Sequence, residues 1–330
     1  MALSIVRFDM RAPGLAPAQA QPLYDAAIEM VEWADAKGFD MAVVSEHHAA
    51  ADGYLPSPIV LASAMAARTR RIALFISALL VPLHDPIRLA EDIAVLDLIS
   101  NGRISVIAGL GYRPVEYELL GKAWNRRGKL LDEALEVMIQ AWAGEPFEYR
   151  GQTVQVTPRP LQQPHPTVLI GGGGPAAAKR AARLGFGMFP SIDDPELARI
   201  YREECERLGT TPGWVAVPSG PPTLFVAEDP DRLWGQIGSY LLHDAMTYRS
   251  WQPEGQTSHV KADATTVDAL RAEGVYQILT PEECVAVAGE IGPFGAMTHH
   301  PLCGATPPEY GWASLELYVD RVLPHVRNAG

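Results

Sequence analysis

Two adjacent histidines at the end of an apolar run are the residues in this chain best suited to acid–base chemistry. Ser45-Glu46-His47-His48 follows the run 39–44, so a carboxylate and two imidazoles leave a predicted strand together. The unperturbed pKa of histidine lies near neutral pH, which suits proton transfer, and a neutral imidazole also hydrogen-bonds a cofactor or substrate. The residue types leave catalysis and a structural hydrogen-bonding role both open. Adjacent strand residues point to opposite faces, so we expect no metal site here.

Two glycine-containing segments could approach a ligand closely. The run Gly171, Gly172, Gly173, Gly174 stands between a predicted strand and a helix that begins at Pro175. Its N–H groups and the positive end of the helix dipole could hold a phosphate without a basic side chain, although a tight turn is the simpler alternative. In the second segment, 109–113, Gly109 and Gly111 allow close approach, and Tyr112 is followed by Arg113, a forked cation for phosphate or carboxylate.

Five further residues, in two segments, could have either a structural or a functional role. Ser77 and Ala78, at the end of another predicted strand, leave room for a planar ring, but small residues also pack tightly inside a barrel. His299, His300 and Cys303 leave the last predicted strand. We interpret the two histidines as buried and hydrogen-bonded, and the cysteine as inert.

The elements that position these residues alternate between short apolar runs and longer helical patterns, which predicts βα units in a parallel sheet. Eight such units in one chain favour a (β/α)8 TIM barrel, whose chemistry lies at the carboxyl ends of its strands. A doubly wound open sheet would need a phosphate fingerprint after its first strand, and none stands between Phe8 and Pro22. The predicted strands are 2–8, 39–44, 72–81, 104–109, 168–171, 187–190, 223–227 and 296–302.

We expect residues 1–330 to form a single domain with additions to the barrel. The segment 147–157 predicts a hairpin that turns at Arg150-Gly151. The segment 243–292 is interpreted as an insertion that carries a short helix at 266–273 and a strand-like run at 275–279.

Composition excludes several classes of partner. The chain has 330 residues, is 48% hydrophobic and carries a formal net charge of -12, which disfavours nucleic acid and anionic membranes. Neither a secretory signal nor an apolar run of about 18 residues is present, so a cytoplasmic protein is expected. The three cysteines form no Cys-x-x-Cys pair, which predicts reduced thiols.

Taken in order, these residues resemble the bacterial-luciferase-like family of flavin-dependent monooxygenases and oxidoreductases. The resemblance extends over nearly the whole chain, and four segments carry it: Glu46-His47-His48, PLHDPIRLAED at 82–92, LDLISNGR at 96–103, and the glycine run with the AAAKRAARLGFG that follows Pro175. It implies a barrel that holds FMN, or a deazaflavin in some branches, and a homodimer built on helices near the second and third βα units. It also implies a non-proline cis peptide beneath the flavin ring, at Ser77-Ala78.

The resemblance assigns roles residue by residue. His47 matches the luciferase histidine implicated in acid–base work on the peroxyflavin, and His48 lies beside it. Gly173, Gly174 and Ala177 match the phosphate-contact stretch of luciferase. The side-chain contacts of luciferase are absent there, so backbone amides would hold the phosphate.

Two departures from luciferase argue against light emission. Gly109 stands where luciferase has a reactive cysteine, and Leu110 stands where it has a phosphate-binding arginine. Arg113 remains as a substitute cation. The residues expected to contact the cofactor are therefore Ser77, Ala78, Gly109, Gly111, Tyr112, Arg113, Gly171, Gly172, Gly173 and Gly174.

Three functions are consistent with these residues. The first is a monooxygenase that receives reduced FMN from a separate NAD(P)H-dependent flavin reductase and uses molecular oxygen to oxidise a small organic substrate, with His47 and His48 as its acid–base groups. The second is a deazaflavin-dependent oxidoreductase that transfers hydride without oxygen. The third is a non-catalytic flavin-binding protein. The sequence names no substrate.

Overall fold

The computed structural model describes residues 2–217, 219–252, 258–292 and 295–328. Contacts within the chain divide it into two compact units, one made of residues 1–43, 50–55 and 218–330 and the other of residues 44–49 and 56–217. We call them the first and the second unit. The prediction of a single domain with an insertion at 243–292 is not tested by this division.

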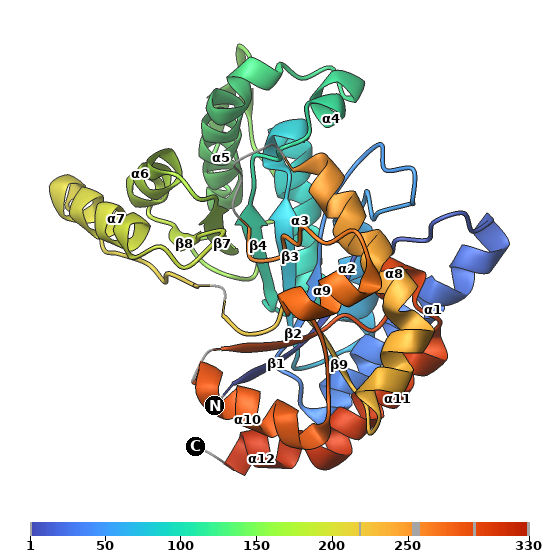
Figure 1. Ribbon diagram of the computed structural model, residues 1–330. Coiled ribbons are helices and arrows are strands. Elements are labelled where there is room, and N and C mark those ends of the chain that lie inside the picture. The colour runs from blue at the N-terminus through green and yellow to red at the C-terminus, as the bar shows by residue number, and fades with distance from the viewer. Residues whose placement is uncertain (1, 218, 253–257, 293–294, 329–330) are drawn as a thin grey trace. The chain divides into compact units, whose positions relative to one another are not determined.

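Four parallel strands form the sheet of the second unit (Figure 1). They are β3 (Ala73–Leu79), β4 (Ile104–Ala108), β7 (Thr167–Gly171) and β8 (Gly187–Phe189), hydrogen-bonded in that order. The register places Leu79 beside Ala108, and Ala108 beside Ile170. The carboxyl ends of β3, β4 and β7 therefore lie in one row, and the segments that follow them start from the same edge.

Helices and short connections complete the second unit. Several of these helices begin with proline and are followed by a glycine in the left-handed conformation. Helix α6, for example, begins at Pro175 and has Gly185 as its C-cap. The elements are α2 (Pro58–Arg68), η1 (Val81–Leu83), α3 (Pro86–Ser100), α4 (Pro114–Leu119), η2 (Trp124–Arg126), α5 (Arg127–Ala143), the hairpin β5 (Phe147–Tyr149) and β6 (Gln152–Val154), α6 (Pro175–Leu184) and α7 (Pro195–Leu208).

The first unit contains the remaining strands, in the order β10-β9-β11-β1-β2. They are β1 (Leu3–Phe8), β2 (Met41–Val44, whose last residue belongs to the second unit), β9 (Thr223–Val226), β10 (Tyr276–Leu279) and β11 (Ala296–His299). Its helices are α1 (Pro17–Lys37), α8 (Pro230–Trp251), α9 (Val267–Glu273), α10 (Pro281–Ile291), η3 (Cys303–Ala305), α11 (Pro308–Arg321) and α12 (Leu323–Asn328). A buried cluster that includes Phe225, Trp234, Ile237 and Leu241 packs α8 onto β9.

All eight predicted strands are present, and so are the hairpin and the extra strand near 275. The predicted bounds were wrong in places. The third strand ends at Leu79 instead of 81, because Pro82 lies in the 3-10 turn η1. The sequence predicts a first helix over about 22–37, but this helix begins at Pro17, where Gln19 accepts a hydrogen bond from the Ala16 N–H.

The largest difference lies at the start of the proposed insertion. Helix α8 runs through His243 to Trp251, so the segment interpreted as an insertion begins inside a helix. Residues 253–257 of that segment lie outside the described residues.

Within the described residues, no helix is both long enough and apolar enough to cross a bilayer.

Candidate active site

Glu46 is the buried anchor of the segment that follows β2. Its side chain is fully buried, and Oε1 accepts hydrogen bonds from His48 Nε2 and His84 Nε2, each at 2.8 Å. Oε2 accepts the Leu80 N–H at 2.6 Å. Burial alone would raise the pKa of this carboxyl, but the hydrogen bonds from the two imidazoles lower it to about 2. Glu46 is therefore ionised at neutral pH and fixes the β3–η1 turn to the end of β2.

His48 is also held by this contact. Burial lowers its pKa, but the hydrogen bond and the negative charge of Glu46 outweigh that effect, so the net pKa is raised. His48 is half-buried, and it approaches Glu46 two residues away because the segment 45–48 is not extended strand.

His47 points to a different partner. Its Nδ1 lies 2.8 Å from Oε1 of Glu116 on α4, and its Nε2 lies 2.9 Å from the hydroxyl of Tyr112. His47 comes from the segment after β2, Tyr112 and Glu116 come from the segments after β4, and Glu116 is fully buried. Carboxylate, imidazole and phenol thus form a continuous hydrogen-bonded row, which we call the Glu116–His47–Tyr112 row.

Glu116 is held in its ionised form by several donors. Besides His47, the His48 N–H donates to Oε1 at 2.9 Å and Arg113 Nη1 donates at 3.1 Å. Burial raises the pKa of Glu116, but the hydrogen bond and charge of His47 lower it further, and the net pKa is below the usual value. The other oxygen, Oε2, is buried and has no hydrogen-bond partner among the described residues.

The guanidinium of Arg113 donates hydrogen bonds to groups in and beside this row. Beyond Glu116, its guanidinium donates to the carbonyls of His48 and Ala49. We had expected Arg113 to offer a cation to phosphate or carboxylate; the carboxylate that the structure places beside it is Glu116.

The carboxyl ends of β3 and β4 lie side by side and carry small residues. Ser77-Ala78 is a cis peptide, as the resemblance implies. Gly109 is buried beside it, and a Cβ at Gly109 would lie 2.8 Å from Cβ of Ala78. Gly111 has φ +73°, a conformation that favours glycine, and its α-carbon faces Leu80 and Oε2 of Glu116. Only glycine at position 109 permits this close approach.

The glycine run lies one strand further along. Gly171 ends β7, Gly172 has φ +134°, and Gly174 is the N-cap of α6, a helix of ten residues. In the described part of the chain no hydrogen bond uses the N–H of Gly173 or Gly174. These donors and the helix dipole fit an anionic phosphate, so the run can hold the tail of a flavin nucleotide. A Cβ at Gly173 would lie 2.5 Å from Oγ of Ser191, so a side chain at this position would displace the serine hydroxyl.

Two groups in the described residues bring three metal-ligand atoms within 4.8 Å of one another: Glu46 with His48 and His84, and Asp244 with His300 and Cys303. In the first group, the carboxylate already accepts hydrogen bonds from both imidazoles. In the second, Asp244 is paired with Arg11 and with the Tyr276 hydroxyl. We assign neither group a metal.

The late histidines belong to the first unit. His299 is buried against the ring of Tyr318, with 4.2 Å between ring centroids, and burial lowers its pKa to about 3. Its two nitrogens have no hydrogen-bond partner among the described residues, so our expectation of a hydrogen-bonded histidine was wrong there. His300 Nε2 lies 3.4 Å from Asp9 Oδ1, but its nitrogens also make no hydrogen bond among the described residues, so the expectation was wrong for both histidines. Cys303 is buried.

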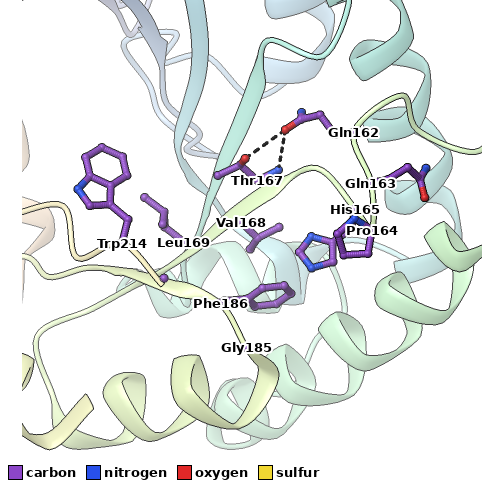
Figure 2. A pocket seen from close by; sticks show the side chains of 11 residues that line it. Gln162, Gln163, Pro164, His165, Thr167, Val168, Leu169, Gly185, Phe186 and Trp214 are labelled. Carbon is purple, nitrogen blue, oxygen red and sulfur yellow. Dashed lines mark hydrogen bonds between the residues drawn. The ribbon is translucent and has the colours of Figure 1, made fainter. Parts of the chain in front are cut away.

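A separate cleft of about 400 Å³ opens in the second unit at the amino ends of β7 and β8 (Figure 2). Phe186, His165 and Trp214 line it, and Gln162 accepts two hydrogen bonds from Thr167 at its edge. Because the row and the glycine run follow the carboxyl ends of the strands, this cleft is not part of the candidate active site.

Sequence reasoning had named His47, His48, Tyr112, Arg113 and the glycines, and the structure brings the first four together. It had missed Glu116 and His84 as members of the site. A usable signal existed for Glu116, because it lies three residues after Arg113 at the start of a helix opened by Pro114. No local pattern links His84 to Glu46, 38 residues earlier.

Comparison with known proteins agrees with this geometry. A family model described as luciferase-like monooxygenase matches residues 5–287. The chain belongs to the luciferase-like monooxygenase family. This family membership confirms the resemblance, and the chain shares an α/β fold with luciferase-like monooxygenases.

One curated relative is the oxygenase component of the flavin-dependent trigonelline monooxygenase of Acinetobacter baylyi, 31% identical over 199 residues, which are 56% of this chain and 55% of that protein. The chain thus spans about half the length of the curated relatives it matches.

Three solved structures share the fold over nearly the whole chain. The monooxygenase RslO1 of Streptomyces bottropensis is 28% identical with a TM-score of 0.77, covering 98% of this chain and 99% of that one. The oxygenating constituent of 3,6-diketocamphane monooxygenase of Pseudomonas putida, in complex with FMN, is 23% identical with a TM-score of 0.71 and the same coverage. An F420-dependent secondary alcohol dehydrogenase is 18% identical with a TM-score of 0.65, covering 99% and 100%.

Proposed function

We propose that this protein is the oxygenase component of a two-component, FMN-dependent monooxygenase. In this proposal a separate NAD(P)H-dependent reductase supplies reduced FMN, and molecular oxygen is used to oxidise a small organic substrate. Bound FMN would supply the electrons that activate oxygen. The names of the trigonelline and diketocamphane enzymes support this class of reaction, and the three buried, unpaired cysteines fit the reducing cytoplasm.

The observation that carries the proposal is the shared edge of β3, β4 and β7. Register places Leu79 beside Ala108 and Ala108 beside Ile170, so Gly109 lies between Ala78 and the start of the glycine run. A planar ring on the small residues and a phosphate at Gly173 and Gly174 would follow this edge. Arrangements of this kind, with an anion at a helix N-terminus, need no basic side chain.

Side chains of this protein supply the acid–base groups and hold the proposed ring site in position. Glu46 holds the β3–η1 turn through Leu80, and so fixes the small residues that would seat the ring. Glu116 accepts from His47 Nδ1 and thereby sets which nitrogen of the imidazole carries a proton. His47 and His48 are the proposed acid–base groups of the site, and His47 acts through its hydrogen bond to Tyr112.

Binding of two cofactors tests the proposal. Tryptophan fluorescence is followed during anaerobic titration with reduced FMN and, separately, with reduced deazaflavin. Saturable binding of reduced FMN, and oxygen uptake that exceeds the rate of free reduced flavin, are expected. Binding of the deazaflavin alone would replace the proposal with hydride transfer, for which the F420-dependent neighbour provides only the shared fold.

We also propose that the protein is a homodimer. Helix α3 exposes Val95, Leu98 and Ile99 on one face, and the neighbouring α2 exposes Val60, at 71% of its surface. Apolar side chains gathered in this way are typical of interaction surfaces. A second copy of the chain is the occupant implied by the family resemblance, and sedimentation tests it.

A further inference from the structure

The Glu116–His47–Tyr112 row contains a phenol where a direct contact from histidine to the reacting group would be expected. Tyr112 Oη lies 2.9 Å from His47 Nε2, and the two rings meet edge to face with 5.1 Å between centroids. His47 Nδ1 is taken by Glu116 at 2.8 Å. Both nitrogens of His47 therefore face protein groups, and His47 cannot reach a ligand while Tyr112 stays in place.

The charge of Glu116 decides where the protons lie. An ionised carboxylate only accepts hydrogen bonds, so His47 must carry its proton on Nδ1. In a neutral imidazole Nε2 is then an acceptor, and the Tyr112 hydroxyl donates to it. In an imidazolium Nε2 becomes a donor to the phenolic oxygen, and the Tyr112 hydrogen is turned outward.

We propose that Tyr112 is the catalytic residue that hands over the proton, with His47 as its proton source and Glu116 as a positioning residue. The transfer starts from the imidazolium form of His47, which a proton from solvent forms from the neutral imidazole. The Tyr112 O–H bond breaks as the proton passes to the acceptor, and the proton on His47 Nε2 moves to the phenolic oxygen. The row ends as neutral Tyr112, neutral His47 and ionised Glu116, with one proton delivered. This inference rests on the proposed function, because the acceptor would be oxygen reduced by bound FMN.

The environment of Tyr112 supports this order. Tyr112 follows Gly111 at the end of β4, three residues after Gly109, so its segment starts at the edge proposed to seat the ring. It is half-buried, whereas His47 and Glu116 are buried behind it. In the row, Tyr112 is thus the member most exposed to solvent.

A measurement on the protein without cofactor tests the arrangement. Imidazole nitrogens are observed by ¹H–¹⁵N correlation in ¹⁵N-histidine-labelled protein, with His47→Gln to assign the signal. We expect His47 to carry its proton on Nδ1, with Nε2 hydrogen-bonded. Tyr112→Phe should shift Nε2 toward the unbonded value, and Glu116→Gln should populate the other tautomer. A His47 signal that neither variant moves would overturn the row.

A single-turnover reaction tests the proton transfer. Protein loaded with reduced, anionic FMN is mixed with oxygen, and hydrogen peroxide release is timed; flavin gives two electrons and one proton, and the row gives the second proton. Tyr112→Phe and His47→Gln should each slow release by about 100-fold, in the range typical of general acids. The double variant should be no slower than the slower single variant, because the two act as a unit.

Tyr149→Phe, on the β5–β6 hairpin, is the matched control and should keep the rate of the native protein. Release from Tyr112→Phe at the native rate, or losses that multiply in the double variant, would overturn the inference while leaving the proposed function intact. Absence of reduced FMN binding by the native protein would instead defeat the proposed function, and the imidazole signals would still decide the row.

Discussion

Glu46→Gln should remove a part of the protein's acid sensitivity that can be worked out from the structure. The carboxyl is almost fully buried and its pKa lies at about 2 instead of 4.5, because His48 and His84 donate to it. A carboxyl with a lowered pKa stabilises the fold above its unfolded pKa, and that contribution is lost as the pH falls toward the folded value. The window for this loss is therefore about pH 4.5 down to about 2.

The size of the effect follows from the same shift. A difference of about 2.5 pKa units corresponds to about 3 kcal/mol once fully expressed, and about 1 kcal/mol of it is lost between about pH 5 and 3.5. Urea unfolding of the apo-protein at several pH values measures this. The native protein should lose about 1 kcal/mol more than Glu46→Gln over that interval.

The control and the refuting outcome are both direct. Glu206→Gln replaces an exposed glutamate on α7 and should keep the pH dependence of the native protein. If Glu46→Gln and the native protein lose stability in parallel from pH 5 to 3.5, then Glu46 is not held by the two imidazoles as described.

Three further predictions concern the glycines and the exposed helix face. Gly173→Val places a Cβ 2.5 Å from Ser191 Oγ and should weaken reduced FMN binding by at least about 10-fold in fluorescence titration. Riboflavin has no phosphate and should bind as it does to the native protein. Equal losses of affinity for both ligands would contradict a phosphate site. The Cβ of Gly109→Val would lie 2.8 Å from Cβ of Ala78, so this variant should lower the free energy of unfolding by about 1–3 kcal/mol. The control Gly235→Ala adds a Cβ that meets no atom within 4 Å and should leave it unchanged. An unchanged urea midpoint in Gly109→Val would refute the close approach. Val95→Asp should produce monomers in sedimentation velocity and Leu208→Asp should not, and a monomeric native protein would end the dimer proposal.

The sequence predicted the strands well because each is a compact apolar run and several are bounded by glycine or proline, as β4 is by Gly102 and Gly109. Proline suits the first turn of a helix, so the sequence also predicts helices that open near Pro175, Pro195 and Pro230, and all three begin there. It failed where distant residues decide the outcome. Helix α8 continues to Trp251, and its buried face packs in a cluster with Tyr276 and Ile278 of strand β10.

The site was predictable in part for the same reason. His47 and His48 stand out by type and place in the chain, but their partners are set by tertiary folding. Glu116 lies 69 residues from His47, and His84 lies 38 residues from Glu46. The separation of the two histidines, one facing Glu116 and the other facing Glu46, could not be read from a dipeptide.

A crystal structure of the protein soaked with FMN tests the central claim most directly. The account predicts the phosphate within hydrogen-bond distance of the N–H groups of Gly173 and Gly174, the ring against Ala78 and Gly109, and Tyr112 Oη directed at the ring or at the space above it. A phosphate bound elsewhere, or a ring that leaves Tyr112 and His47 out of reach, would contradict it.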